Sequence, residues 1–295
     1  MTSSRPLFVG FLAATALASC ARGADQPAAK VTIENDIVYT RAGGSDLKLD
    51  LARPSEGDGP FPVVLVIHGG GWRGGSKDGN RPALAEFAKR GYVAVSPQYR
   101  FCPKDTFPAQ VHDVKAAVRW VKAHAGQYKA DPGHVGAVGF SAGGHLSMML
   151  GVTGPSDGLE GETGGGGPDS SIQAVVNYFG PTDMAASDIP EATRPLIKDF
   201  LGGTPREKAK EAAEASPLTF VSKGDAPILT FQGTKDPLVP HTQATKLADA
   251  MTAAGVPGRV ELLIGAGHGW GGDDLKRTMD ETFAFFDKYL KRSGR

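Results

Sequence analysis

Short apolar segments alternate with amphipathic segments of helical length along most of the chain. Phe61–Ile67 is apolar throughout, as expected for a strand that is covered on both faces of a sheet. Pro108–His124 instead places four valines on one side of a predicted helix. This alternation predicts an α/β protein with a mainly parallel sheet of about eight strands and helices on both faces.

The remaining elements follow the same two patterns. Alternating or fully apolar runs predict strands at Val31–Tyr39, Leu47–Leu51, Tyr92–Val95, Val135–Val138, Ile172–Phe179, Ile228–Gln232 and Val260–Ile264. Amphipathic stretches predict helices at Arg81–Arg90, His145–Leu150, Thr242–Ala254 and over the apolar stripe from Leu275 to Leu290. The first two strands alternate apolar and polar positions, which is typical of a half-exposed antiparallel edge.

Two segments interrupt the alternation. Gly151–Ser171 includes the low-complexity run Gly164–Pro168 and predicts a loop. Asp183–Gly224 is mostly helical, including Arg206–Ala215, but it contains few large apolar residues. We therefore expect a small helical cap over the active face of the sheet, and one α/β domain over residues 31–295.

The first residues have the pattern of an export signal. Arg5 precedes the apolar stretch Leu7–Leu17, which is too short to span a membrane as a stable anchor. The following Leu17–Cys20 resembles a bacterial lipobox. We therefore expect a lipoprotein signal peptide at residues 1–19 and a lipid on Cys20. An ordinary signal peptide that is cleaved nearby is the alternative.

The lipobox has consequences for location and for cysteine chemistry. Residues 20–30 are small and polar and predict a tether to the α/β domain. Ala21 follows the cysteine, which by resemblance argues against retention in the inner membrane. We expect an exported protein of the bacterial cell envelope, in the periplasm or at the outer membrane, held by its lipid alone. With Cys20 lipidated, Cys102 is the only other cysteine, so no disulfide can form within the mature chain.

The composition excludes several classes of partner. The chain contains 32 Lys and Arg and 32 Asp and Glu, so no excess charge favours nucleic acid or an anionic surface. The sequence has no His-Glu-x-x-His motif, cysteine pair or acidic calcium loop that would predict a metal, and no phosphate or dinucleotide loop. We therefore expect neither a cofactor nor a metal, and the sequence makes no prediction of oligomeric state.

The run Gly139-Phe140-Ser141-Ala142-Gly143 lies between a predicted strand and a predicted helix. This order is typical of a nucleophile elbow, a strained turn that exposes the serine Oγ at the edge of the sheet. Gly139 and Gly143 fit because a Cβ atom at either position would meet neighbouring backbone. The N–H of Ala142 lies at a helix start, where the helix dipole favours negative charge. The pattern predicts Ser141 as a nucleophile.

A serine nucleophile needs a base and a carboxylate that orients this base. Asp236 and His268 each follow a predicted strand, and the carboxyl ends of parallel strands lie on one side of a sheet. The chain order serine, aspartate, histidine is typical of α/β-hydrolases. His241 is the only rival base, and Asp183, which also follows a strand, is the second candidate for the acid. His145 lies on the helix after the serine and is expected to pack in the interior.

A second glycine motif, His68-Gly69-Gly70-Gly71-Trp72, ends the apolar strand and predicts one arm of an oxyanion hole. With the serine elbow, Gly180-Pro181-Thr182-Asp183, Gly233–Pro240 and Gly267-His268, it resembles the α/β-hydrolase esterases. The nearest resemblance is to the BD-FAE-like feruloyl and acetyl-xylan esterases, akin to the hormone-sensitive-lipase family, and it spans about Ile37–Leu290. It implies the α/β-hydrolase fold and an oxyanion bound by the N–H groups of Gly70, Gly71 and Ala142.

The expected function is that of a serine carboxylesterase for small acyl groups of acetyl or feruloyl type. Its partner is expected to be a small-molecule or carbohydrate ester, such as an esterified plant polysaccharide, with Trp72 and Asp183 contributing to substrate binding. One alternative is a serine peptidase of the prolyl-oligopeptidase type, although the chain has no room for the usual propeller domain. The other is a non-catalytic envelope lipoprotein, against which the intact set of catalytic residues argues.

Overall fold

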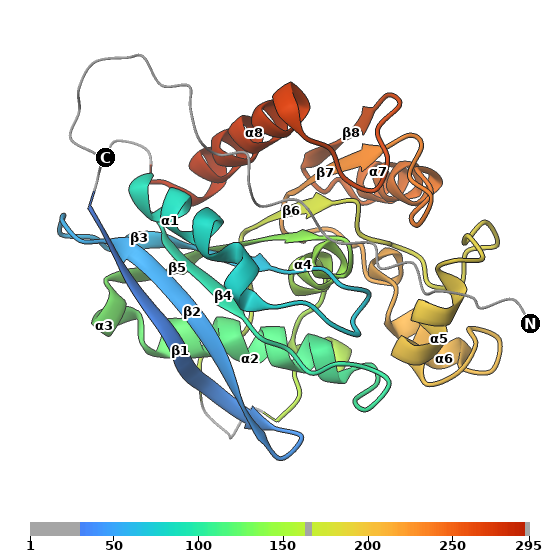
Figure 1. Ribbon diagram of the computed structural model, residues 1–295, viewed down its shortest axis with the longest axis horizontal. Helices are drawn as coiled ribbons and strands as arrows, with labels where there is room; N and C mark the ends of the chain where they lie inside the picture. The colour runs from blue at the N-terminus through green and yellow to red at the C-terminus, as the bar shows by residue number, and fades with distance from the viewer. Residues whose placement is uncertain (1–29, 163–166, 293–295) are drawn as a thin grey trace, which may run out of the picture.

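The computed structural model, which describes residues 30–162 and 167–292, contains one eight-stranded sheet with the order β1-β2-β4-β3-β5-β6-β7-β8 (Figure 1). Strands β3 to β8 are parallel to one another, and β1 and β2 add two antiparallel strands at one edge. The strands are β1 (Val31–Ala42), β2 (Ser45–Pro54), β3 (Phe61–Ile67), β4 (Val93–Pro97), β5 (Ala130–Phe140), β6 (Ala174–Tyr178), β7 (Ile228–Gly233) and β8 (Gly258–Leu263). The predicted α/β-hydrolase architecture is therefore confirmed.

Helices cover both faces of the sheet. Apolar side chains of α1 and α8 pack against one face, and those of α2, α4 and α7 pack against the other. Figure 1 shows α1 and α8 on the side of the sheet opposite to α2. The helices are α1 (Arg81–Lys89), α2 (Ala109–Ala123), α3 (Ala125–Tyr128), α4 (Ala142–Val152), α5 (Arg194–Leu201), α6 (Ala209–Glu214), α7 (Thr242–Ala254) and α8 (Gly272–Leu290).

Strand β3 shows why a fully apolar segment is needed at the centre of such a sheet. Val63, Leu65 and Ile67 belong to the hydrophobic cluster under α2 and α4, whereas Val64 and Val66 belong to the cluster under α1 and α8. Successive side chains of a strand point to opposite faces, so both sets are buried at once. This burial fixes the end of β3, from which the glycine-rich loop begins.

The β1–β2 hairpin is longer than the sequence predicted. Both strands continue into the expected turn, and only Gly43 and Gly44 connect them. Their φ angles are +58° and +79°, which glycine adopts without a steric penalty and which suit a two-residue hairpin turn. The antiparallel, half-exposed edge was predicted correctly, but its register depends on this pair of glycines.

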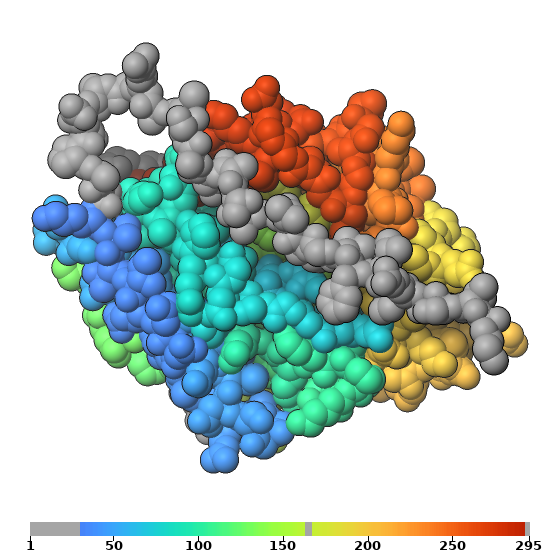
Figure 2. Space-filling view, in the orientation of Figure 1, coloured from blue at the N-terminus to red at the C-terminus, as the bar shows by residue number. Residues whose placement is uncertain are grey.

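The cap consists of α5, α6 and a short 3₁₀ turn at Pro217–Thr219. The helix expected at Arg206–Ala215 is shorter than predicted, and α5 carries the large apolar side chains of the cap. Of these, Ile197, Phe200 and Leu201 are buried in the main hydrophobic cluster. In Figure 2 the cap forms the yellow and light-orange surface at the opposite end of the view from the blue hairpin.

The glycine-rich loop after α4 is attached to α2 by ion pairs. Glu160 accepts hydrogen bonds from Lys115 Nζ at 2.8 Å and from Arg119 at 2.7 Å. Lys115 is fully buried, and its ammonium also donates to the carbonyl of Thr153 and to Ser170 Oγ. The predicted loop therefore has a fixed attachment, since a buried ammonium requires these acceptors.

The predicted signal peptide and almost all of the predicted tether lie outside the described residues. Within residues 30–162 and 167–292, no helix is both long enough and apolar enough to cross a membrane.

Candidate active site

Ser141 lies in the sharp turn between β5 and α4. Its φ of +55° and ψ of −120° are strained for a residue with a side chain, a cost of order 1–3 kcal/mol that surrounding contacts must offset. Two backbone hydrogen bonds hold it there: its N–H donates to Tyr178 O at 2.8 Å, and its carbonyl accepts the N–H of His145 at 3.0 Å. This is the geometry of a nucleophile elbow.

The flanking glycines are required by close backbone contacts. A Cβ atom on Gly139 would lie 2.1 Å from the carbonyl oxygen of Gly143. A Cβ atom on Gly143 would lie 2.1 Å from the carbonyl oxygen of Ile67, at the end of β3. Both distances are far below van der Waals contact, so the elbow can form only with glycine at these positions.

The three predicted triad residues form one hydrogen-bonded chain. His268, in the loop after β8, places Nε2 2.9 Å from Ser141 Oγ and Nδ1 2.7 Å from Asp236 Oδ2. In the tautomer with a proton on Nδ1, the imidazole donates to the aspartate and accepts the serine proton. The structure thus brings together residues from the ends of β5, β7 and β8.

Four hydrogen bonds fix the acid in its orientation. Asp236 Oδ1 accepts the N–H groups of Leu238 at 2.8 Å and Val239 at 2.9 Å. Asp236 Oδ2 accepts Gln232 Nε2 at 3.0 Å in addition to the histidine. Sequence reasoning missed Gln232; the available signal was a single amide side chain near the end of a mostly apolar strand, directly before the acid loop.

Phe179 packs on the catalytic imidazole. The ring centroids of Phe179 and His268 are 4.7 Å apart, and Trp270 meets Phe179 edge-on at 5.3 Å. Phe179 follows β6 with a φ of +44°, and its side chain is buried. These rings exclude water from one side of the base and restrict the orientation of the imidazole.

The glycine motif after β3 forms an irregular loop beside the elbow. Gly70, Gly71 and Trp72 have successive positive φ angles of +122°, +60° and +57°. Among the hydrogen bonds of the described residues, none uses the N–H groups of Gly70, Gly71 or Ala142. They are therefore available to an anionic ligand, as the resemblance implied.

The Trp72 side chain, which was predicted to contribute to substrate binding, lies in the interior of the protein. Its side chain is only 2% exposed. The indole stacks on Phe200 of the cap, with ring centroids 4.3 Å apart and planes at 14°, and its N–H donates to His145 Nδ1 at 3.2 Å. The positive φ of Trp72 turns the side chain away from the surface and into the core. Leu196, whose methyl groups would lie 3.3 Å from a Cβ atom on Gly71, is another cap residue next to the loop.

Asp183 belongs to the loop after β6. Its side chain is 26% exposed, and its carboxylate accepts the N–H of Ala185 at 3.0 Å and Lys246 Nζ at 3.3 Å. The contact with Lys246 joins the loop to α7, and neither contact is to the triad. The rival base His241 precedes α7, where its carbonyl accepts the N–H of Ala244.

Two further histidines of the motifs are buried. His68 stacks on Tyr99 at 4.4 Å, its Nδ1 bonds to the carbonyl of Gly69, and burial lowers the pKa of His68 below its ordinary value. His145 is fully buried, and burial lowers the pKa of His145 to about 4. Neither imidazole contacts the hydroxyl of the nucleophile, and the buried position of His145 agrees with its expected packing role.

Among the described residues, Cys102 is a free, buried thiol. Burial raises its pKa to about 11, so it is a thiol at neutral pH. Because the thiolate is the reactive form of cysteine, Cys102 is not a competing nucleophile.

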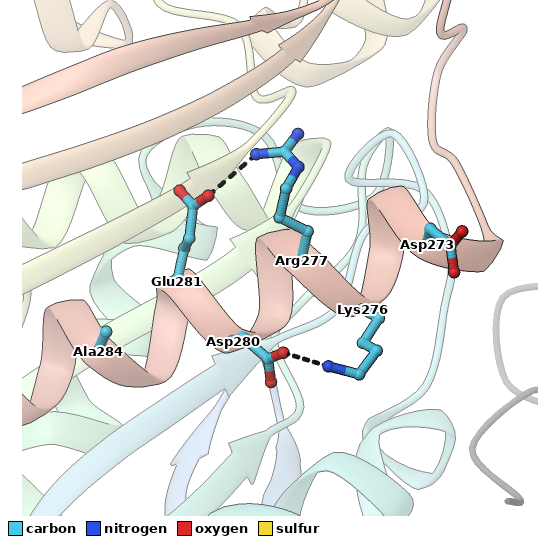
Figure 3. Close-up of a pocket in the computed structure, with 6 residues that line it drawn as sticks. All are labelled: Asp273, Lys276, Arg277, Asp280, Glu281 and Ala284. Atoms are coloured by element: carbon cyan, nitrogen blue, oxygen red, sulfur yellow. Dashed lines mark hydrogen bonds and ion pairs between the residues drawn. The ribbon is translucent and has the colours of Figure 1, made fainter. Parts of the chain in front are cut away.

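Charged side chains also gather on the exposed face of α8, outside the active site. Figure 3 shows a shallow hollow on α8, where Lys276 bonds to Asp280 and Arg277 bonds to Glu281 along one exposed helix face. Such i,i+4 pairs are ordinary features of a solvated helix. Among the described residues, no group of three or more His, Cys, Asp or Glu side chains could hold a metal ion.

The sheet order, the elbow and the hydrogen-bonded Ser-His-Asp chain define an α/β-hydrolase with a serine nucleophile site. The BD-FAE family model matches residues 49–251, and the chain belongs to this family.

Relatives and solved structures agree with this assignment. The chain is 34% identical over 224 residues to the "Probable carboxylic ester hydrolase LipM" of Mycobacterium tuberculosis, covering 74% of this chain and 51% of that protein. It is 32% identical over 227 residues to the esterase LipC of the same organism, covering 74% and 55%. The chain thus spans about half the length of the curated relatives it matches.

This chain aligns with nearly the full length of two solved esterase structures. A truncated carbohydrate esterase from gut microbiota has a TM-score of 0.76 and 28% identity, covering 90% of this chain and all of that one. Esterase Est2 of Thermogutta terrifontis has a TM-score of 0.73 and 27% identity, covering 91% and 96%.

Proposed function

We propose that the protein is a serine carboxylesterase. The observation that carries the proposal is the unbroken hydrogen-bonded chain from Ser141 through His268 to Asp236. Ser141 Oγ attacks the ester carbonyl while His268 Nε2 takes its proton, and His268 then protonates the leaving alcohol. Water, deprotonated by the same imidazole, releases the acid and restores the free serine.

The oxyanion that forms at each step is proposed to bind three backbone N–H groups. Those of Gly70 and Gly71 come from the loop after β3, and that of Ala142 lies at the first position of α4. The helix dipole adds to their positive potential. Loss of one such donor typically lowers kcat by about a hundredfold or more.

We propose a small acyl group on a polar alcohol, of acetyl or feruloyl type, as the substrate class. A long acyl chain would need an exposed apolar surface, because each CH₂ group buried contributes about 0.8 kcal/mol to binding. The large apolar side chains of α5 are used for internal packing, which leaves little such surface. The similarity to a carbohydrate esterase from gut microbiota supports an esterified polysaccharide as the polar alcohol.

The acyl preference is tested with a series of p-nitrophenyl esters. We expect kcat/KM to fall from acetate or butyrate to palmitate, because the added methylene groups find no apolar surface to bury them. Acetylated xylan fragments should release acetate, measured directly in the reaction mixture. The Ser141→Ala protein serves as the control for spontaneous hydrolysis. A profile that peaks at palmitate, with no acetate from the fragments, would replace this substrate class with that of a lipase.

We propose that the mature protein is attached to the bacterial cell envelope through a lipid on Cys20. A palmitate analogue supplied to growing cells should label the exported protein, because the lipobox at Leu17–Cys20 directs acylation of this cysteine. Cys20→Ala should remove the label, and Cys102→Ala should leave it unchanged. An unlabelled protein with a mature N-terminus at another residue would indicate an ordinary secretory signal instead.

A further inference from the structure

The backbone of the oxyanion loop has one hydrogen bond of its own, from the N–H of Arg73 to the carbonyl of Gly70 at 3.1 Å. Three successive residues with positive φ, Gly70, Gly71 and Trp72, determine the direction in which the N–H groups point. Glycine adopts such angles readily but equally adopts others, and tryptophan disfavours them. The orientation of the N–H groups therefore depends in part on the contacts that fix Trp72.

Trp72 is fixed at three points. Its carbonyl accepts the N–H of Cys102 at 2.9 Å, and its ring stacks on Phe200 at 4.3 Å. The third contact is directional: the indole N–H donates to His145 Nδ1 at 3.2 Å, with the two rings nearly perpendicular at 88°. Only this contact connects the tryptophan to the helix that begins at the nucleophile.

His145 is itself held by the nucleophile helix and the cap. It lies one turn after Ser141, and its N–H donates to the serine carbonyl at 3.0 Å. Its ring is fully buried, and Nε2 lies 2.8 Å from the carbonyl oxygen of Ala215 at the end of α6. The two partners require one tautomer, since Nε2 must donate to the carbonyl and Nδ1 must accept from the indole. Burial, which lowers the pKa of His145 to about 4, keeps this neutral form at neutral pH.

We propose that His145 is a positioning residue for the oxyanion hole, acting through Trp72. Because His145 lies on the nucleophile helix and accepts the indole hydrogen bond, it fixes the loop relative to this helix. The N–H groups of Gly70 and Gly71 then stay correctly placed relative to the N–H of Ala142. This inference rests on the proposed esterase function and adds to it a residue that takes no part in proton transfer.

Two substitutions separate the two hydrogen bonds of the imidazole. In His145→Asn, the amide oxygen lies near the former position of Nδ1, where it can accept the Trp72 indole N–H. In His145→Gln, the amide nitrogen lies near the former position of Nε2, where it can donate to the Ala215 carbonyl. Asparagine is the smaller side chain and leaves the larger cavity, so it should be the less stable protein. His145→Asn therefore keeps the indole hydrogen bond at lower stability, whereas His145→Gln loses this hydrogen bond at higher stability.

We expect kcat to follow the indole hydrogen bond. His145→Gln should lower kcat for p-nitrophenyl acetate by about tenfold or more at nearly unchanged KM, because misplaced donors weaken binding of the transition state. His145→Asn should stay within about threefold of the wild type although its Tm is lower. Trp72→Phe should lower kcat as much as His145→Gln does. The double variant Trp72→Phe with His145→Gln should lose no more kcat than either single variant, since both substitutions remove the same hydrogen bond.

The indole hydrogen bond is observed directly by NMR of protein labelled with ¹⁵N-tryptophan. The chain has three tryptophans, and Trp72→Phe identifies the resonance of Trp72. This resonance should stay downfield in His145→Asn and move upfield in His145→Gln. His124→Gln is the matched control, because His124 stacks on Trp120 at 4.3 Å on α2 and has no contact with the loop; its kcat should equal that of the wild type.

The outcomes distinguish the two proposals. If the wild type is active but kcat of the variants follows Tm, so that His145→Asn is slower than His145→Gln, His145 is a packing residue. This outcome would overturn the positioning role and leave the proposed function in place. A wild type that hydrolyses no ester of the series would overturn the proposed function, and the positioning role with it. Agreement of kcat with the Trp72 resonance across the wild type, His145→Asn, His145→Gln and His124→Gln supports the positioning role.

Discussion

Replacing Ser141 with alanine is expected to lower kcat for p-nitrophenyl acetate by at least about a thousandfold, as loss of the nucleophile does in serine hydrolases. The Oγ atom lies 2.9 Å from His268 Nε2, so the imidazole can remove its proton as the bond to the ester carbon forms. Alanine leaves the base, the acid and the oxyanion donors in place but provides no atom that can be acylated. Residual activity would come from electrostatic stabilisation alone.

The same residue should be the site of covalent labelling. A fluorophosphonate probe is expected to modify the wild-type protein at one site per chain, and peptide mass mapping should locate the modification at Ser141. Ser55→Ala is a suitable control, because Ser55 lies beside the β1–β2 edge, where its Oγ pairs with Thr32. Stoichiometric labelling that persists in Ser141→Ala would show that another group is the nucleophile. A wild type that neither reacts with the probe nor hydrolyses esters would favour the non-catalytic alternative.

The sheet could be predicted from the sequence because burial on both faces leaves a strong local signal. A strand such as Phe61–Ile67 must be apolar at every position, and the intervening helices need an apolar stripe. The elbow and the chain order of the triad also follow from short motifs whose geometry is dictated by backbone contacts. The structure therefore places the elbow and the three triad residues at the strand ends where the sequence predicted them.

The environment of the triad could not be predicted in the same way. Trp72 follows three glycines in an irregular loop, and no periodicity indicates which side of such a loop its side chain occupies. Its positive φ directs the indole into the core, and its partners, Phe200 and His145, are 128 and 73 residues away along the chain. Gln232 was missed for a related reason, since its role arises only when the acid loop folds back over the strand.

The choice of the catalytic acid rests on contacts that the sequence could not supply. Both candidate carboxylates follow a parallel strand, but only Asp236 reaches the imidazole, at 2.7 Å. The carboxylate of Asp183 is bound by Lys246 and by a backbone N–H. The sequence favoured Asp236 by its loop alone, and the hydrogen bonds now give the physical reason for the preference.

Asp236→Asn is expected to lower kcat by about four orders of magnitude with little change in the fold. The amide oxygen of asparagine can keep the hydrogen bonds from Leu238 and Val239, which hold Oδ1 of the aspartate. Its NH₂ group then faces His268 Nδ1 and also opposes the NH₂ group of Gln232. A donor at this position stabilises the imidazole tautomer that carries its proton on Nε2. That tautomer cannot accept the proton of Ser141. Asparagine also lacks the negative charge with which the aspartate stabilises the imidazolium.

The measurement compares Asp236→Asn with Asp183→Asn in steady-state kinetics, with Tm as the check on folding. Asp183→Asn should leave kcat within about threefold of the wild type, because it alters an exposed ion pair with Lys246, and such pairs contribute little. A greater loss of kcat in Asp183→Asn, at an unchanged Tm, would transfer the role of the acid to the loop after β6. The hydrogen bonds predict the opposite, a much larger loss of kcat in Asp236→Asn than in Asp183→Asn. The loss in Asp236→Asn should lie in kcat rather than in KM, because orientation of the base matters only once the serine proton moves.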